Sequence, residues 1–172
     1  CRDFNSYRDR ANAYFQPEDV LIGELAAARS RKRGKYDAIM LLSGGKDSAY
    51  AIYRLAALTG NILAMTLDNG FISDTAKTSI RRITEDIGVD HRFVSTPAMN
   101  DIFRDSLTRF SNVCQGCFKT IYAMALKVAR DEGIPAIVTG LSRGQFFETR
   151  LTPDLFRAAA PNAAEIDALV MD

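Results

Sequence analysis

Residues 38–48, AIMLLSGGKDS, decide the fold of this chain. The first half is an apolar run typical of a buried strand, the second half holds two adjacent glycines, and a helical pattern follows from Ala49. Glycine lets a backbone bend tightly and come close to a ligand. The N–H groups of a first helical turn, together with the helix dipole, favour negative charge. The stretch therefore predicts an anion site at the end of a strand.

The polar side chains of this turn fit the same site. Ser43 and Ser48 add hydroxyl donors, and Lys46 adds a mobile positive charge. Asp47 would repel a bare phosphate, so its presence indicates a bridging Mg²⁺. A Walker A loop is excluded, because Met40 stands where that loop needs a glycine and Asp47 where it needs Ser or Thr. The remaining alternative is an ordinary glycine-rich turn between a strand and a helix.

The hexapeptide at 43–48 resembles the PP-loop of the ATP pyrophosphatases, also called the adenine nucleotide alpha-hydrolase superfamily. The resemblance implies cleavage of ATP between its alpha and beta phosphates. AMP would pass to an acceptor oxygen, pyrophosphate would leave, and a nitrogen or sulfur nucleophile would then displace AMP. Catalytic roles are implied for Lys46 and for Asp47, which would hold magnesium. The loop residues implied to bind the nucleotide are Ser43, Gly44, Gly45, Lys46, Asp47 and Ser48.

The bulk composition describes one ordinary domain. The chain has 172 residues, 47% of them hydrophobic and 25% charged, which is typical of a soluble globular protein. Its net charge of +1 gives no general attraction to nucleic acid or membrane, and no apolar run approaches the roughly 20 residues that span a bilayer. Three cysteines do not resemble a secreted disulfide framework, which favours a reducing cytoplasm. Because the chain begins at Cys1 rather than Met, we expect residues to be missing before it, and some also after Asp172.

Apolar runs alternate with helical patterns along the chain. The predicted strands are approximately 36–43, 61–68, 91–95 and 135–140, and the predicted helices approximately 48–59, 74–87, 98–110 and 117–131. This alternation predicts an α/β fold, a three-layer sandwich around a doubly wound, mostly parallel, Rossmann-like sheet. Such sheets bind ligands at the carboxyl ends of their strands. We expect three segments: 1–35, helical and cysteine-bearing; 36–152, the nucleotide-binding domain; and 153–172, a truncated helical tail.

Two further strand ends carry candidate site residues. In PP-loop enzymes the adenine commonly lies against backbone at the end of the second strand, so the resemblance implies nucleotide contacts for Leu67, Asp68 and Phe71. The alternative there is a simple Asn-Gly turn. The last strand ends at Gly140, and the polar loop that follows holds Gln145. The corresponding loop borders the ATP site in many PP-loop enzymes, which implies contacts for both of these residues.

The same loop contains Arg143, which could neutralise the charge that builds on pyrophosphate. A surface ion pair is the alternative for this arginine. Thiolases of the superfamily carry a Gly-His-x-x-Asp-Asp pattern at this point. The chain has Gly-Leu-Ser-Arg-Gly-Gln from 140 to 145 instead, which weakens an assignment to the tRNA thiolases.

Cys114 and Cys117 are spaced Cys-x-x-Cys at the start of a predicted helix, which suits metal ligation or redox chemistry. Cys1 supplies a third thiol, and residues 1–4, CRDF, look like the end of another Cys-x-x-Cys. Three interpretations stay open: a structural zinc site, an iron–sulfur cluster or persulfide carrier, and thiols without a ligand. The single His91 is expected to have no role in the site.

Three classes of function fit these motifs. Cys-Arg-Asp-Phe at the start, Asp-Asn-Gly-Phe after the second strand and the internal Cys-x-x-Cys make the chain similar to the N-acetyl sugar amidotransferase branch, over roughly residues 1–145. Such enzymes resemble half of a pair that receives ammonia from a partner glutaminase. A sulfur transferase is favoured by the cysteine pair and by the basic cluster at 29–35, which otherwise is a solvated helix end. The third class is a non-catalytic nucleotide-binding module.

The resemblance implies ATP and Mg²⁺ as cofactors, with zinc or an iron–sulfur cluster at the cysteines. The expected partners are a small-molecule or tRNA acceptor and an ammonia- or sulfur-donor protein, with no membrane. Because thiolases and amidotransferases of this superfamily are often dimers, the resemblance also allows a homodimer. The motifs leave the choice between nitrogen and sulfur transfer open.

Overall fold

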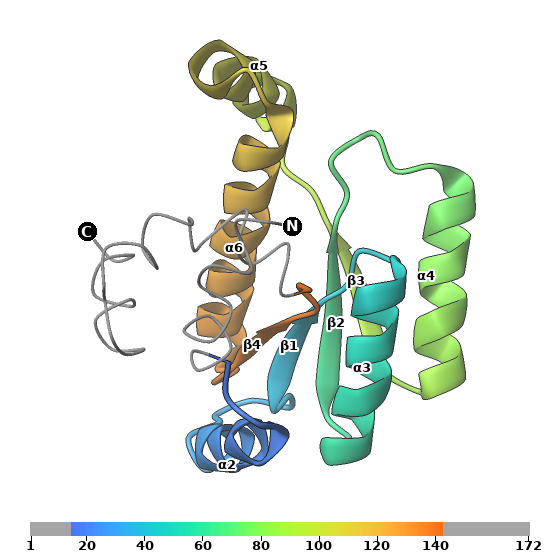
Figure 1. Ribbon diagram of the computed structural model, residues 1–172, viewed down its shortest axis with the longest axis vertical. Helices are drawn as coiled ribbons and strands as arrows, with labels where there is room; N and C mark the ends of the chain where they lie inside the picture. The colour runs from blue at the N-terminus through green and yellow to red at the C-terminus, as the bar shows by residue number, and fades with distance from the viewer. Residues whose placement is uncertain (1–14, 143–172) are drawn as a thin grey trace, which may run out of the picture. The chain divides into compact units, whose positions relative to one another are not determined.

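The computed structural model describes residues 15–142, and the unit Glu24–Gly140 carries the sheet and its helices (Figure 1). A second unit consists of Cys1–Gly23 and Leu141–Asp172, of which 15–23 and 141–142 are described. No helix within 15–142 combines the length and the apolarity needed to cross a bilayer. The elements are α2 (Glu18–Arg29), β1 (Ala38–Leu41), α3 (Lys46–Leu58), β2 (Ile62–Leu67), α4 (Asp74–Ile87), β3 (Asp90–Val94), α5 (Met99–Phe110), α6 (Val113–Glu132) and β4 (Ile137–Thr139).

The strands of this unit are parallel and lie in the order β3-β2-β1-β4. The chain moves outward from β1 to β2 and β3, then returns to the other side of β1 as β4. The direction of winding therefore reverses between β1 and β4. The strand order confirms the predicted doubly wound α/β fold. Sheets of this kind bind ligands at the carboxyl ends of their strands, at the point of reversal.

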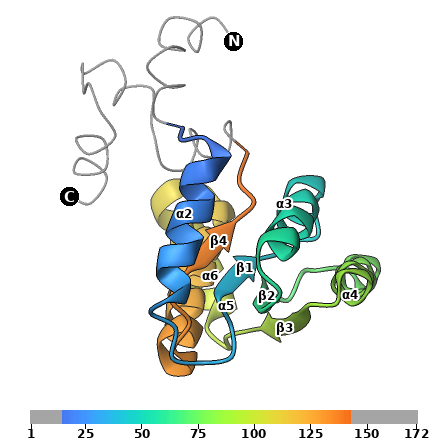
Figure 2. The same cartoon turned by 90° about the horizontal axis from the view of Figure 1, so that it is seen from below.

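Helices α3 and α4 cover one face of the sheet and α6 covers the other (Figure 2), and α5 packs against α6. Successive strand residues point to opposite faces, so each central strand contributes to two cores. Ile39 and Met65 pack on the α6 side, whereas Met40 and Ala64 pack on the side of α3 and α4. Every residue of β1 and β2 is buried, as expected of strands covered on both faces.

Helix α4 shows how local signals set the bounds of an element. It begins where the Ser73 hydroxyl accepts from the Ala76 N–H at 3.2 Å. It ends at Gly88, whose φ of 77° suits a left-handed cap. The observed bounds, Asp74–Ile87, equal those predicted from the sequence.

The start of α6 corrects a prediction. The sequence predicts a helix from about 117, after the Cys-x-x-Cys, but the helix begins at Val113. Asn112 is the reason, because its Oδ1 accepts from the Cys114 N–H at 2.6 Å and caps the helix earlier. Both Cys114 and Cys117 are therefore residues of the helix itself.

Buried Asp37, directly before β1, forms ion pairs with α2 and with the segment that follows α2. Its Oδ1 accepts from Lys32 Nζ at 2.6 Å, and its Oδ2 lies 3.6 Å from Arg29 Nε and accepts from the Thr59 hydroxyl. Burial raises the pKa of this carboxyl, but the hydrogen bonds from Lys32 and Thr59 outweigh burial and hold the pKa below its usual value. Within the basic cluster at 29–35, Arg29 and Lys32 thus form ion pairs with Asp37, and Lys35 forms one with Asp90.

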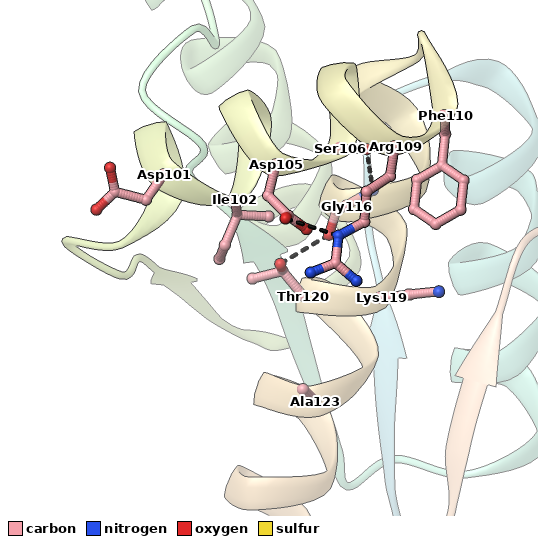
Figure 3. A pocket seen from close by; sticks show the side chains of 10 residues that line it. All are labelled: Asp101, Ile102, Asp105, Ser106, Arg109, Phe110, Gly116, Lys119, Thr120 and Ala123. Atoms are coloured by element: carbon pink, nitrogen blue, oxygen red, sulfur yellow. Dashed lines mark hydrogen bonds and ion pairs between the residues drawn. The ribbon is translucent and has the colours of Figure 1, made fainter.

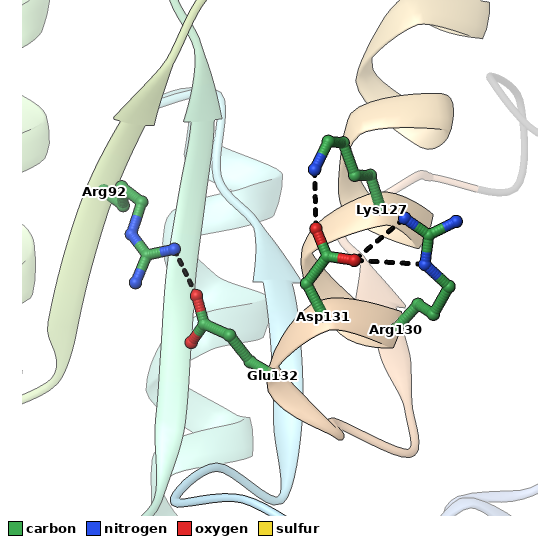
Figure 4. A network of polar contacts seen from close by, with 5 residues as sticks. All are labelled: Arg92, Lys127, Arg130, Asp131 and Glu132. Atoms are coloured by element: carbon green, nitrogen blue, oxygen red, sulfur yellow. Dashed lines mark hydrogen bonds and ion pairs between the residues drawn. The ribbon is translucent and has the colours of Figure 1, made fainter.

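Ion pairs also hold the carboxyl end of α6 (Figure 4). Glu132 pairs with Arg92 of β3, and Asp131 accepts from Lys127 Nζ at 2.6 Å and from Arg130 at 2.8 Å. These side chains are partly or largely exposed, so each pair contributes little to stability. The group involves none of the candidate site residues.

Candidate functional site

The loop at 43–48 connects β1 to α3 and leaves the amino end of α3 open. Gly44 has a φ of +79°, which side chains rarely adopt, and a Cβ there would lie 2.7 Å from Ile80 Cγ1 of α4. Gly45 is the N-cap of α3, and no side chain caps this helix. The N–H groups of residues 46–48 therefore point out of the helix without an internal acceptor. An open helix terminus of this kind is an anion site.

Ser43 and Ser48 hold the loop closed. The Ser48 hydroxyl donates to the Gly45 carbonyl at 3.0 Å and accepts from the Ser43 N–H at 3.3 Å. The two hydroxyl oxygens lie 3.0 Å apart, which leaves the Ser43 proton to bridge them. Both hydroxyls thus stabilise the turn, a role that the sequence prediction of two donors to a ligand did not include.

Lys46 and Asp47 form a charged pair at the start of α3. Lys46 Nζ lies 2.8 Å from Asp47 Oδ1, and the two side chains are 90% and 41% exposed. Pairs with this exposure are weak, so each partner can exchange the other for a ligand. Mg²⁺ in nucleotide sites is bound through one or two carboxylates together with substrate phosphates. An accessible carboxylate beside an open helix terminus fits that donor set, and Asp47 is the residue that would hold the ion.

Gly140, directly after β4, packs against the first turn of α3. A Cβ at this position would lie 2.6 Å from Ser48 Cα and 3.2 Å from the Asp47 carbonyl oxygen. Only glycine allows two backbones to approach so closely. The contact lies where the winding of the sheet reverses, at the expected ligand position. Gly140 therefore adjoins the phosphate loop, and its contact with a nucleotide stays a prediction.

The loop after β2 holds the other predicted nucleotide contacts. The Leu67 side chain is buried in the core, so only its main chain can meet a ligand. Asp68 Oδ1 accepts from the Gly70 N–H at 3.1 Å and so stabilises a tight turn. Phe71 is 73% exposed, and its ring lies beside Phe103 of α5 with centroids 5.6 Å apart. The loop thus presents backbone, one carboxylate and one aromatic face.

Lys77 of α4 is a candidate site residue that no sequence motif predicts. Its Nζ lies 2.6 Å from Asp68 Oδ2, and both side chains are about one-quarter exposed. The hydrogen bonds from Lys77 and from the Gly70 N–H hold the pKa of the Asp68 carboxyl below its usual value. Lys77 precedes Ile80 by one turn, so it lies on the helix face that meets Gly44. Lys77 therefore adds a second positive charge, besides that of Lys46, on the side of α4 that faces the phosphate loop.

The cysteine pair lies in the first turns of α6. Cys114 is exposed and Cys117 is partly buried, and their spacing places them on one face of the helix. Asn69 Nδ2 lies 3.7 Å from Cys117 Sγ, which links this turn to the loop after β2. Within 15–142, no three His, Cys, Asp or Glu side chains gather into a cluster able to hold a metal ion. Cys1, the third predicted ligand, lies outside the described residues.

Gly116, between the two cysteines, is a packing contact of α6 with α5. A Cβ there would lie 2.9 Å from Ser106 Cβ and 2.9 Å from Ile102 Cγ2. We expect Gly116→Ala to lower the free energy of unfolding by about 1–3 kcal/mol, because overpacking forces the two helices apart. Urea unfolding measures the change, with the exposed neighbour Gln115→Ala as a control within about 0.5 kcal/mol of wild type. Equal stability of both variants would contradict this packing role.

An open groove of about 550 Å³ lies between α5 and α6 (Figure 3). Its charged side chains already have partners, because Arg109 Nε donates to Asp105 at 2.8 Å and Lys119 Nζ lies over the Phe110 ring at 5.3 Å. The Ser106 hydroxyl accepts from the Gly116 N–H in its wall. None of the residues that line the groove belongs to the phosphate loop, and the charges of the groove are compensated internally.

His91 is half-buried on β3, with its Nε2 2.9 Å from Thr66 Oγ1 and its ring edge-on to Phe93. Burial, with a smaller contribution from the charge of Arg81, lowers the pKa of the imidazole below its usual 6.5. The unfolded chain then binds the proton more readily than the folded protein. The stability that His91 contributes is complete above about pH 6.5 and is lost as the pH falls from there toward the folded-state pKa.

We expect an NMR titration to give a pKa below 6.5 for this imidazole. Assignment is immediate, since the chain contains one histidine. A second titration in denaturant gives the reference value for the unfolded chain. A folded-state pKa equal to or above that reference would contradict the burial of the ring.

The described residues bring together the phosphate loop, Gly140 and the Lys77 face of α4. Separately, they link the loop after β2 to the cysteine turn through Asn69. Arg143 and Gln145 lie outside the described residues, so their roles stay predictions. Asn69 contacts Cys117, 48 residues further along the chain, and no local motif predicts this contact. Lys77 contacts Asp68 in the loop that precedes its own helix, and no sequence motif predicts this pair either.

Fold and loop together define the class of protein: a doubly wound α/β domain with an open phosphate loop at the point where its winding reverses. The family model of the queuosine biosynthesis protein QueC matches residues 37–120, from before β1 into α6. The match covers the phosphate loop that the sequence and geometry single out. Over these residues the chain is similar to the PP-loop ATP pyrophosphatase superfamily.

Solved structures with the same fold include two nucleotide-related synthetases. An NH3-dependent NAD synthetase from Campylobacter jejuni aligns with a TM-score of 0.58 and 13% identity, over 96% of this chain and 72% of that chain. An NMN synthetase from Francisella tularensis aligns with a TM-score of 0.58 and 18% identity, over 81% of this chain and 61% of that chain. At these identities the likeness is one of fold.

A sequence relative is an uncharacterized protein of Methanocaldococcus jannaschii, 28% identical over 120 residues and 69% of this chain. The chain spans 43% of the length of that relative.

Proposed function

We propose that the protein is an ATP pyrophosphatase that adenylates an acceptor carbonyl oxygen, so that nitrogen can displace AMP. The observation that carries the proposal is the uncapped amino end of α3, reached by a glycine turn and flanked by exposed Lys46 and Asp47. This arrangement supplies backbone donors, a mobile cation and a carboxylate at one place. It is suited to a polyphosphate that carries a divalent ion.

The reaction needs positioning and charge neutralisation more than proton chemistry. An acceptor oxygen attacks the alpha phosphorus of ATP, and the bond from that phosphorus to the oxygen bridging to the beta phosphate breaks. Pyrophosphate leaves with the electron pair, while the first-turn N–H groups and Lys46 bind its developing charge. A Mg²⁺ ion held by Asp47 would add Lewis-acid stabilisation of the phosphates. Ammonia then attacks the activated carbon, loses a proton, and AMP departs with the acceptor oxygen.

Nitrogen transfer is favoured by the motifs that resemble amidotransferases and by the lack of a Gly-His-x-x-Asp-Asp pattern after Gly140. Sulfur transfer is the second candidate, and a specific contact favours it. Cys117 lies beside Asn69 in the loop after β2, whose backbone is a predicted nucleotide contact. That position gives a thiol access to the same edge of the sheet.

The test supplies the full-length protein with ATP, Mg²⁺, nitrogen-15 ammonium or sulfide, and a pooled set of carbonyl-bearing metabolites and bulk tRNA. We expect a nitrogen-labelled product formed in step with AMP, detected by mass spectrometry. Sulfur incorporation that is lost in Cys117→Ser would favour the second candidate. ATP that binds without ever yielding AMP would contradict both and identify a nucleotide-binding module.

For the cysteines, we propose a ligand set of Cys1, Cys114 and Cys117 that binds zinc, with an iron–sulfur cluster as the alternative. The described residues supply two of these thiols, fewer than the four ligands of a structural zinc site. Metal analysis and the absorbance spectrum of protein purified without oxygen decide the matter. Zinc without colour favours a structural site, iron with acid-labile sulfide favours sulfur transfer, and neither metal contradicts ligation.

A further inference from the structure

Leu42 is the last residue before the phosphate loop. Both of its main-chain groups form hydrogen bonds with β2, the N–H with a backbone carbonyl and the carbonyl with a side-chain hydroxyl. Its N–H donates to the Met65 carbonyl at 2.9 Å, as in a regular parallel ladder. The ladder between β1 and β2 nevertheless ends one residue earlier, at the pair Leu41 and Met65. The Leu42 carbonyl is where the regular pattern stops.

A continued ladder would place the Leu67 N–H on the Leu42 carbonyl. The Asp68 N–H donates to Val94 of β3 at 2.7 Å, so the preceding N–H, that of Leu67, faces β1. Instead, the Thr66 hydroxyl donates to the Leu42 carbonyl at 2.6 Å. Within the described residues, no backbone acceptor takes the Leu67 N–H, which stays open at the carboxyl edge of the sheet.

His91 of β3 fixes the direction of this hydroxyl. The carbonyl of Leu42 can only accept, so the single proton of Thr66 is used there. His91 Nε2, 2.9 Å from Thr66 Oγ1, must then donate to the hydroxyl oxygen. Thr66 is 2% exposed, so its hydroxyl, which links β3 to β1, is shielded from water. The three groups form a continuous polar link beneath the phosphate loop.

We propose that Thr66, oriented by His91, is a positioning residue that occupies the Leu42 carbonyl and so keeps the Leu67 N–H free for the base of a bound nucleotide. The inference rests on the proposed ATP site. A purine edge presents ring nitrogens that accept hydrogen bonds, and a main-chain N–H is a matching donor. Without the hydroxyl, the Leu42 carbonyl would be a buried acceptor with the Leu67 N–H as its nearest regular donor, and the ladder would close.

The experiment compares Thr66→Val, which removes the hydroxyl at similar volume, with Thr66→Ser, which keeps it. Each full-length protein is tested with ATP and with 1-deaza-, 3-deaza- and 7-deaza-ATP, which lack one ring acceptor each. In wild type and Thr66→Ser, one analogue should bind about three- to tenfold more weakly than ATP, the effect of one neutral hydrogen bond. In Thr66→Val the difference in affinity between ATP and that analogue should vanish, because ATP itself should then bind as weakly as the analogue. The kcat should change less than about twofold.

Equal discrimination in wild type and Thr66→Val would overturn the inference, as would equal binding of all four nucleotides to wild type. A purely structural role for Thr66 would weaken ATP and every analogue alike and leave the discrimination intact. Failure of wild type to bind ATP is a different result, since it would overturn the proposed function itself.

Amide hydrogen exchange on wild type keeps the proposal testable if Thr66→Val does not fold. The Leu67 amide should exchange faster than that of Met65, which lies within the paired ladder. Adding ATP should protect the Leu67 amide. Slow exchange at Leu67 without nucleotide would overturn the inference, because it would mean that the ladder is closed.

Discussion

In Lys46→Ala we expect pyrophosphate release from ATP to fall by about 10²- to 10³-fold or to background, the effect of losing a preorganised group that binds transition-state charge. The Lys46 side chain is 90% exposed and pairs with Asp47 alone among the ion pairs of the described residues. Stability should therefore stay within about 0.5 kcal/mol of wild type. Pyrophosphate formation and thermal unfolding, measured on the same preparation, separate the two effects.

Lys127→Ala is the matched control, because Lys127 is also an exposed lysine in an ion pair, but at the far end of α6 (Figure 4). Its activity should stay within about twofold of wild type. Asp47→Ala should abolish pyrophosphate release as Lys46→Ala does, since Asp47 would hold the Mg²⁺ ion. Wild-type turnover in either loop variant would contradict the assignment of the phosphate loop.

Gly140→Ala should lower both the stability and the activity of the protein. Its Cβ would lie 2.6 Å from Ser48 Cα and 3.0 Å from Ser48 N, and backbone cannot move aside as a flexible side chain can. We expect a loss of about 1–3 kcal/mol in the free energy of unfolding, with pyrophosphate release lowered further because the first turn of α3 is displaced. Urea unfolding and the pyrophosphate assay measure the two losses.

Gly60→Ala provides the comparison for this substitution. A Cβ at Gly60 would meet nothing within 4 Å, so its stability and activity should match wild type. If Gly140→Ala also matched wild type, the close approach of β4 to the phosphate loop would be wrong. A loss of stability and activity in both variants would mean that the protein tolerates alanine poorly in general, and the effect of Gly140→Ala could not then be assigned to this contact.

The phosphate loop and the sheet could be predicted because their signals are local. Residues 43–48 hold an uninterrupted motif, and the apolar run before them can only be a buried strand. Helix α4 was predicted to the residue, since Ser73 and Gly88 mark its two ends. The doubly wound parallel fold followed from the alternation of strands and helices, which leaves few topologies for such a sheet.

The missed features involve side-chain contacts that the sequence signals only weakly. Helix α6 was predicted to start too late, because an Asn cap at 112 is a weaker sequence signal than a cysteine motif that suggests a loop. Lys77 resembled any exposed helical lysine until the fold placed it against Asp68. His91 was assigned no site role, and only the register of β3 on β2 brings it to Thr66.

The central claim is that ATP is cleaved between its alpha and beta phosphates. Phosphorus NMR of the products formed by the full-length protein, with Mg²⁺, ammonium and the pooled acceptors, tests it most directly. We predict AMP and pyrophosphate in equal amounts, both absent in Lys46→Ala. ADP and inorganic phosphate as the primary products would contradict the account.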